Sequence, residues 1–314
     1  QEGGVLSRAG WTSIHLGPHM ASRRASHAGS WYTADACELR DQLTSWLGDA
    51  QFSCGAARAI IAPHAGYSYS GPTAAWAYKH VQTKNIKRIF LLGPSHNLYS
   101  PKCLLSAYES YETPIGSLQI DVEVYDQLAM SGLFDEMSHA VDEKEHSLEM
   151  HMPYIVHIFG ESDVTLVPIM VGALSESTEA AVGKLLAPYL ADPQNLFVIS
   201  SDFCHWGERF NFTYHEPSHG GEIHHSIEAL DRQGMALIEA QDAAGFAAYQ
   251  RRFGNTICGR HPIAVLLHAL NAPPAQPDQS STTYQLLFVR YARSSLCRHP
   301  SDSSVSYASA VVWL

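Results

Sequence analysis

Short runs of apolar residues, with almost no polar interruption, recur along the chain and predict buried β-strands. The clearest four cover residues 58–63, 86–93, 165–172 and 195–201. Successive apolar positions are typical of strands that are covered on both faces, because a strand with one wet face alternates instead. Two further runs, 282–292 and 305–312, also predict strands, and the second of these has alternating character.

Between these runs, apolar residues recur every three or four positions, which is the spacing of one helix face. This spacing predicts helices over residues 73–81, 122–130, 143–159, 176–190, 221–240 and 258–270. The alternation of strands and helices indicates an α/β fold with a mostly parallel central sheet flanked by helices. We expect one domain over residues 20–314, with a surface loop at 272–281. Residues 1–19 lack periodicity and are expected to be a tag or an upstream extension.

The chain is acidic, since 31 Asp and Glu residues against 20 Lys and Arg give a net charge of −11. It therefore lacks the basic surface expected of a nucleic-acid-binding protein. No apolar stretch approaches the roughly 18 residues that a membrane-spanning helix needs. The six cysteines form no Cys-x-x-Cys pair, which favours reduced thiols in a cytoplasmic protein. Histidine is abundant, with 18 residues, and this points to metal binding or acid–base chemistry.

Histidine and aspartate residues follow three of the predicted buried strands. His64 comes directly after the first strand, His96 after the second, and Asp202 and His205 after the strand that ends near residue 201. In open α/β sheets, ligands bind at the carboxyl ends of the strands. We therefore expect these four side chains to converge on one functional site.

Cys258 is the candidate for a third metal ligand. It lies at the predicted start of a helix and close to Arg260, and both features are expected to lower the pKa of its thiol. By itself, a cysteine at this place is better interpreted as a small buried residue. With His64 and His96 it makes a set of two histidines and one cysteine, which suits iron, copper or zinc.

A second polar group lies on the predicted helix 143–159. His146 and Glu149 are three positions apart and would share one face of that helix. This face could be an ordinary polar surface, or it could close over the site and support its ligands. The spacing leaves both interpretations open.

Eight stretches of the chain have a distinctive sequence, and together they extend over most of it. They are ASHAGSWY (25–32), RAIIAPHAGYSYSG (58–71), RIFLLGPSH (88–96), DEKEHSLEMHMPY (142–154), VGALSES (171–177), LADPQNLFVISSDFCHWGERF (190–210), NTICGRHP (255–262) and DSSVSYA (302–308). In these stretches the chain closely resembles the Memo family, the mediators of ErbB-driven cell motility.

The resemblance implies the fold of class III extradiol dioxygenases, in which two histidines and one glutamate hold a non-haem iron. By position it implies His64 and His96 as metal ligands, with Cys258 in place of the glutamate. His205, with Asp202, is implied as a vestigial acid–base pair. A thiolate ligand alters the reduction potential of the iron and is itself oxidisable, so ring cleavage is not expected. The expected cofactor is a single iron or copper ion, with zinc as a further option.

The resemblance also implies a role in signalling. The implied partners are a phosphorylated receptor tyrosine kinase tail and the Rho and formin pathway, which acts on microtubules and cell migration. The protein would act in the cytoplasm, and also in the nucleus or at the cell cortex. Trp31, Tyr69 and Arg209 are expected to contact the phosphotyrosine segment through ring stacking and charge.

Three hypotheses therefore remain. The first is a metal-binding signalling adaptor with a vestigial dioxygenase-like site, and the second is a working metal-dependent oxidoreductase with an unknown substrate. The third is a phosphotyrosine-peptide-binding module whose metal site is a relic.

Overall fold

The structure is a computed structural model, and it describes residues 21–160, 162–219, 221–273 and 283–314. The expected extension at 1–19 and most of the expected loop at 272–281 lie outside the described residues. Within the described ranges, no helix is both long enough and apolar enough to cross a membrane.

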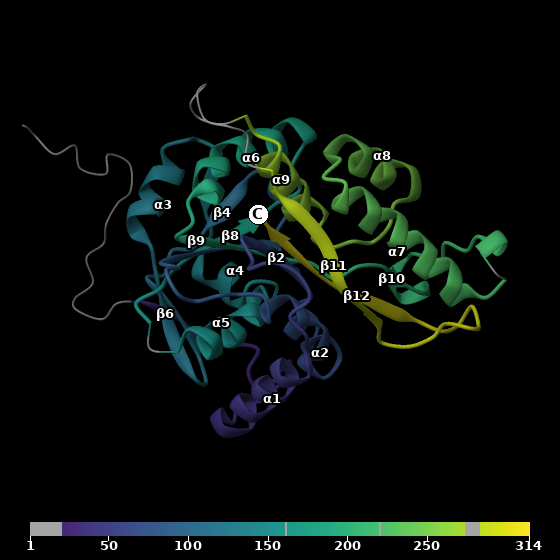
Figure 1. Cartoon of the computed structure of the whole chain (residues 1–314), viewed down its shortest axis with the longest axis horizontal. Coiled ribbons are helices and arrows are strands. Elements are labelled where there is room, and N and C mark those ends of the chain that lie inside the picture. The colour runs from purple at the N-terminus through teal and green to yellow at the C-terminus, as the bar shows by residue number, and fades with distance from the viewer. Residues whose placement is uncertain (1–20, 161, 220, 274–282) are drawn as a thin grey trace, which may run out of the picture.

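A mixed sheet runs through the molecule, with helices on both of its faces (Figure 1). Its strands are β1 (Ser22–Arg23), β2 (Ala59–Ala62), β3 (Arg88–Pro94), β4 (Cys103–Leu105), β5 (Ser110–Thr113), β6 (Gly116–Ile120), β7 (Phe134–Glu136), β8 (Thr165–Val171), β9 (Asn195–Ser200), β10 (His205–Trp206), β11 (Gln285–Arg293) and β12 (Ser304–Trp313). Hydrogen-bonded neighbours follow the order β1-β5-β6-β8-β3-β9-β2-β12-β10, with β11 paired to β12 and with β4 between β7 and β8.

The centre of this sheet is parallel. Strands β6, β8, β3, β9 and β2 all run in one direction, whereas β12 is antiparallel to β2. The carboxyl ends of β2, β3 and β9 therefore meet at one edge, as the apolar runs predicted. This confirms the predicted α/β class with a mostly parallel central sheet.

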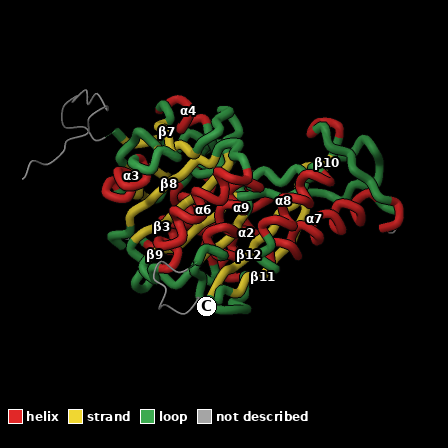
Figure 2. Tube along the Cα trace, turned by 90° about the horizontal axis from the view of Figure 1, so that it is seen from above, coloured by secondary structure: helices red, strands yellow, loops and turns green. Residues whose placement is uncertain are grey.

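Two groups of helices cover the sheet. The helices are α1 (Ala36–Asp49), α2 (Tyr67–Tyr78), α3 (Val122–Ala129), α4 (His139–Lys144), α5 (Met152–Phe159), α6 (Glu176–Ala191), α7 (Ile223–Glu239), α8 (Ala243–Phe253) and α9 (Arg260–Leu270), with short 3-10 turns η1 (Glu149–His151), η2 (Glu208–Phe210) and η3 (Pro217–His219). Helices α1, α2 and α5 pack on one face, and α6 and α9 pack on the other. Seen from above, α7 and β10 extend the molecule at one end (Figure 2).

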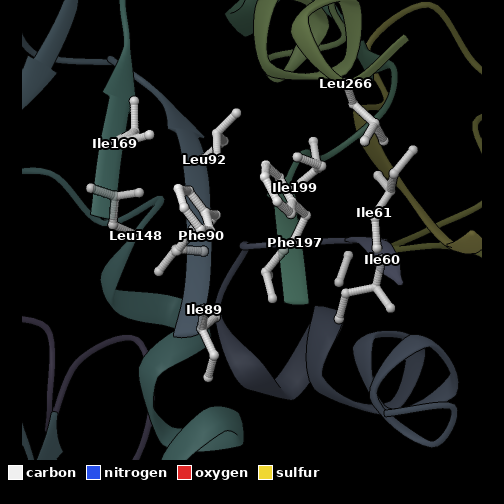
Figure 3. Close-up of a cluster of buried hydrophobic side chains, with 14 of the residues drawn as sticks. Ile60, Ile61, Ile89, Phe90, Leu92, Leu148, Ile169, Phe197, Ile199 and Leu266 are labelled. Carbon is white, nitrogen blue, oxygen red and sulfur yellow. The ribbon is translucent and has the colours of Figure 1, made fainter. Parts of the chain in front are cut away.

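The core lies between the central strands and both helix groups (Figure 3). Ile60 and Ile61 of β2, Phe90 of β3 and Phe197 of β9 are almost fully buried there. The rings of Phe90 and Phe197 stack with their centroids 4.6 Å apart. This packing fixes the positions of the strands from which the site residues emerge.

Several details of the sequence prediction are wrong, and one of them is the helix predicted over 73–81, which runs instead from Tyr67 to Tyr78. The helix predicted over 143–159 is interrupted, because α4 ends at Lys144 and α5 begins only at Met152. Buried polar side chains between them bond to groups outside the segment, and this competes with helix formation. The last predicted helix begins at Arg260 rather than at Cys258. Helices α1 and α8 and several short strands were not predicted.

Candidate metal centre

Strand β2 leads directly to His64, whose side chain is only 1% exposed. Its Nδ1 lies 2.6 Å from Ser200 Oγ, and the Ser200 hydroxyl donates its hydrogen to the carbonyl oxygen of Ser147 at 2.8 Å. Because that hydrogen is already used, His64 Nδ1 must be the donor, and its Nε2 keeps a free lone pair. Burial, and then the neighbouring His96, lower the pKa of His64 well below its usual value, so the ring is neutral.

Strand β3 leads to His96, which is held by a buried carboxylate. Glu145 accepts two hydrogen bonds from this residue, one from the ring Nδ1 at 2.8 Å and one from the backbone N–H at 2.6 Å. Burial opposes ionisation of Glu145, but the bonds from His96 outweigh it and lower its pKa to about 2. A Cβ on Gly93 would lie 2.7 Å from Ser147 Oγ. Glycine at this position therefore lets the segment that carries Glu145 and Ser147 approach β3. Because Nδ1 of His96 donates to Glu145, its Nε2 is left free for a ligand.

Cys258 lies between the ends of these strands. Its Sγ is 3.2 Å from His64 Nε2, and it accepts a hydrogen bond from the backbone N–H of Asp202 at 3.2 Å. Gly259 permits this approach, because a Cβ there would come within 2.4 Å of the Ser200 carbonyl oxygen.

The expected lowering of the Cys258 pKa is wrong for this arrangement. Burial, and then the charge of Asp202, raise the pKa of the thiol well above its usual value. Arg260 is exposed at the start of α9 and does not offset them. The thiol therefore keeps its proton, which it can share with His64 Nε2, until a cation displaces it.

One ligand atom from each of His64, His96 and Cys258 lies within 4.8 Å of the other two. The sequence predicted this convergence from three separate elements, and the geometry bears it out. Two imidazole nitrogens and one sulfur make a donor set that suits copper, zinc or iron.

The two acid–base candidates lie beside this group. Asp202 is buried, and its Oδ1 accepts the backbone N–H of His64 at 2.9 Å. Burial raises the pKa of Asp202, whereas the charge of the nearby His205 lowers it. His205 Nδ1 lies 2.9 Å from the carbonyl oxygen of Phe203 and 3.0 Å from that of Thr256, so Nδ1 carries the proton and Nε2 can accept one.

His146 lies against the candidate ligands, although not on a helix. Its ring stacks on His96 with centroids 4.4 Å apart and meets Trp31 at 4.2 Å on its other side. Burial, and then the neighbouring His96, lower the pKa of His146 to about 4. Trp31 is 36% exposed, so this stack connects the candidate ligands to the surface.

Glu149 belongs to a buried ionic network rather than to the ring stack. It accepts hydrogen bonds from Arg23 Nη1 at 2.7 Å, from the backbone N–H of His27 at 2.8 Å and from the Tyr32 hydroxyl at 2.9 Å. Arg23 also pairs with Asp142 at 2.8 Å. This network fixes the segment that carries Trp31, which gives Glu149 an indirect role.

The side chains of Tyr69 and Arg209 are both exposed. Burial raises the pKa of Tyr307, the charges of Asp202 and Tyr69 raise it further, and that of Arg209 lowers it. Arg209 stacks on Phe210 at 4.4 Å, and Phe210 in turn meets the ring of His205 edge-on at 5.3 Å. Of the three expected peptide contacts, Trp31 therefore reaches the candidate metal centre through His146, and Arg209 reaches it through Phe210 and His205.

Sequence reasoning did not single out the supporting residues Glu145, Ser200, Ser147 and His27. All four lie inside the distinctive stretches 25–32, 142–154 and 190–210, and this is their only signal in the sequence. Ser200 is the last residue of the apolar strand β9, and nothing in its neighbourhood marks a hydroxyl that orients a histidine.

Comparison with known proteins identifies the family. A family model described as Memo-like protein matches residues 23–311. Protein MEMO1 of Danio rerio is 51% identical over 295 residues, which are 93% of this chain and 98% of that protein. Protein MEMO1 of Homo sapiens is 50% identical over 292 residues, covering 92% of this chain and 97% of that protein. A more distant relative, protein memo-1 homolog of Caenorhabditis elegans, is 43% identical and covers 93% of this chain and 83% of that protein.

A solved structure of an uncharacterized protein from Escherichia coli K12 aligns with a TM-score of 0.48 and 12% identity, covering 80% of this chain and 98% of that chain. The family assignment rests instead on the sequence matches, which extend over nearly the whole chain. The chain belongs to the Memo-like protein family.

Proposed function

We propose that this protein binds one iron or copper ion through His64, His96 and Cys258 and acts as a cytoplasmic signalling adaptor. The observation that carries the metal proposal is the convergence of three ligand atoms within 4.8 Å, with both histidine Nδ1 atoms already engaged elsewhere. Zinc fits the same donors.

The surrounding residues support such a site. Metal-bound histidines usually donate their second N–H to a carboxylate or another acceptor, as His96 does to Glu145 and His64 to Ser200. When bound, a redox-active ion would supply one-electron chemistry beside a thiolate. His205 Nε2 is placed to accept a proton from a molecule bound there, and Asp202 would stabilise the resulting imidazolium.

Metal analysis of protein purified without a polyhistidine tag, under anaerobic conditions, tests this proposal. We expect close to one iron or copper ion per chain, and almost none in Cys258→Ser. Cys37→Ser is the matched control, because Cys37 is exposed and lies outside the site. Equal metal content in wild type, Cys258→Ser and Cys37→Ser, with all three folded by circular dichroism, would remove Cys258 from the site.

For the adaptor role, we propose that a phosphotyrosine-bearing tail of a receptor tyrosine kinase binds at Trp31, Tyr69 and Arg209 and that the signal passes to the Rho and formin pathway. The supporting observation is exposure, since Trp31 is 36% and Tyr69 60% exposed beside the candidate centre. The net charge of −11 repels a phosphopeptide at long range, so the contact must depend on local cations and rings.

Calorimetry with a phosphotyrosine peptide tests this contact. Arg209→Ala should weaken binding by about 1–3 kcal/mol, which is typical of charge-assisted hydrogen bonds. Arg252→Ala is a control, because Arg252 is exposed on α8 and stacks only on its neighbour Phe253. Unchanged affinity in Arg209→Ala would exclude this residue from the contact.

A further inference from the structure

A cavity lies between helices α6, α8 and α9, and none of the candidate metal ligands lines it. Its volume is about 280 Å³, close to the lower end of the range for small-molecule sites. Leu174, Phe246 and Ala264 contribute apolar surface to its wall. The cavity is therefore large enough for a small molecule with a short apolar chain.

Two buried nitrogen atoms of this wall have no hydrogen-bond partner in the described structure. They are Nε2 of His261 and the amide nitrogen Nε2 of Gln250. His261 Nδ1 is engaged, since it lies 2.5 Å from Oε1 of Glu179. A buried polar atom without a partner costs about 1–3 kcal/mol, so two around one cavity point to a missing polar partner. Both atoms are shielded from solvent, so a ligand would reach them only after a small side-chain rotation.

One arginine at the rim of the cavity has no carboxylate partner among the described residues and can attract an anion. Arg251 pairs with Glu176 across the rim, and Glu179 is taken up by His261. Arg260 also lines the cavity, is exposed, and forms no ion pair with any residue that the structure describes. Within the described ranges, Arg260 is therefore a cation without a paired carboxylate at the mouth of a cavity with an apolar wall.

We propose that this cavity binds a small aliphatic monocarboxylate. Its carboxylate would pair with Arg260 and accept a hydrogen bond from Gln250, while its chain would lie against Phe246 and Ala264. This binding is independent of the metal centre, and no covalent change of the ligand is involved.

Binding of sodium hexanoate to the full chain, compared with uncharged hexanamide, tests the proposal by calorimetry or ligand-observed NMR. We expect hexanoate to bind at least about tenfold more tightly than hexanamide, since only the carboxylate can pair with Arg260. Arg260→Gln should remove this preference. Arg252→Gln, which changes the same charge on α8 outside the cavity, should retain it. Ala247→Leu, which fills the cavity from α8, should abolish binding of both compounds.

Gln250→Met provides a second measurement that does not depend on the tolerance of α8 for leucine. This change removes an unpartnered polar group at similar volume, so the free protein should resist urea better than wild type. The same variant should bind hexanoate more weakly. The proposal is overturned if wild type binds no hexanoate, or if Arg260→Gln and Arg252→Gln weaken binding equally.

Discussion

Two of the histidine–carboxylate pairs in the described structure, His96–Glu145 and His261–Glu179, are similar in geometry but have different surroundings. His96 Nδ1 lies 2.8 Å from Glu145, and His261 Nδ1 lies 2.5 Å from Glu179, with both carboxylates nearly buried. Around His96, the other ring nitrogen faces His64 and Cys258. Around His261, the other ring nitrogen has no partner among the described residues, and the nearby cavity wall is mostly apolar.

The comparison shows that such a pair does not define a function by itself. A carboxylate fixes which ring nitrogen carries the proton, and the neighbours of the second nitrogen then decide what can bind. Two further ligand atoms favour a metal ion at His96. An apolar wall with one spare cation favours an organic anion near His261.

The largest effect is expected from removing Arg23, which supports the His96–Glu145 pair and has no counterpart among the described residues at the His261–Glu179 pair. Arg23 donates to the backbone carbonyl of Glu145 at 2.8 Å and pairs with two buried carboxylates. Arg23→Met would leave those carboxylates uncompensated, and it should lower the free energy of unfolding in urea by about 3–5 kcal/mol. Arg24→Met removes the adjacent, exposed arginine and should cause no measurable loss. Equal losses in the two variants would contradict a specific role of the buried network.

Exchanging each carboxylate for an amide tests the two pairs directly. Glu145→Gln should weaken metal binding by roughly 10–100-fold, since an amide orients and polarises the His96 ring less well. Glu179→Gln makes the same change at His261 and should leave metal affinity unaltered. Competition with a chromogenic chelator measures both. If Glu145→Gln and Glu179→Gln lose metal affinity equally, the two histidine–carboxylate pairs do not differ in the way proposed.

Replacing the sulfur of Cys258 should change which ion the candidate metal centre prefers. Cys258→Glu offers a hard carboxylate in place of a soft thiolate, so the preference for Fe²⁺ over Cu(I) should rise by at least about tenfold. The variant should also resist oxidative loss of metal, because the oxidisable thiol is gone. Competitive anaerobic loading of both proteins is the measurement. An unchanged preference would mean that residue 258 is not a ligand.

The smallest effect is expected at the partly exposed ion pair between Arg88 and Asp121. The change in stability measured there is a reference for the changes at the two buried pairs. Burial raises the pKa of Asp121, but bonds from Val124, Arg88 and Thr165 outweigh this and lower it. The ionised Asp121 carboxylate therefore adds to the free energy of unfolding above pH 4–5. This contribution is lost as the pH falls through the lowered pKa. Asp121→Asn, which keeps the helix cap, should cost at most about 1 kcal/mol at pH 7. In urea titrations, the difference from wild type should shrink as the pH falls below the usual pKa of an aspartate, and a difference that stays constant on acidification would exclude this pair as its cause.

The sequence predicted the parts of the fold that depend on burial. Strands β2, β3, β8 and β9 were found because each is covered on both faces and is apolar throughout. Short strands such as β4 and β7 have only three residues each, too few to show a period. The interruption between α4 and α5 could not be foreseen, because the polar residues there bond to partners far away in the chain.

The candidate site was predictable to the same extent. His64, His96 and His205 follow strands or strand-like runs, so sheet topology alone brings them to one edge. Their supports were not predictable, since Ser200 is separated from His64 by 136 positions and Glu145 from His96 by 49. Which nitrogen each ring presents depends on those long-range bonds.

The antiparallel strand β12 has a consequence for how the protein is made. It pairs with β2, and Ser306 exchanges backbone hydrogen bonds with Phe203 and Cys204, next to Asp202 and His205. During synthesis, β2 and the loop after β9 emerge long before residues 304–313 do. One edge of β2 therefore stays unpaired in the nascent chain, where it can pair wrongly with other strands or be held by a chaperone. The segment that carries Asp202 and His205, beside the candidate metal centre, therefore gains its backbone bonds to Ser306 only after β12 has been made.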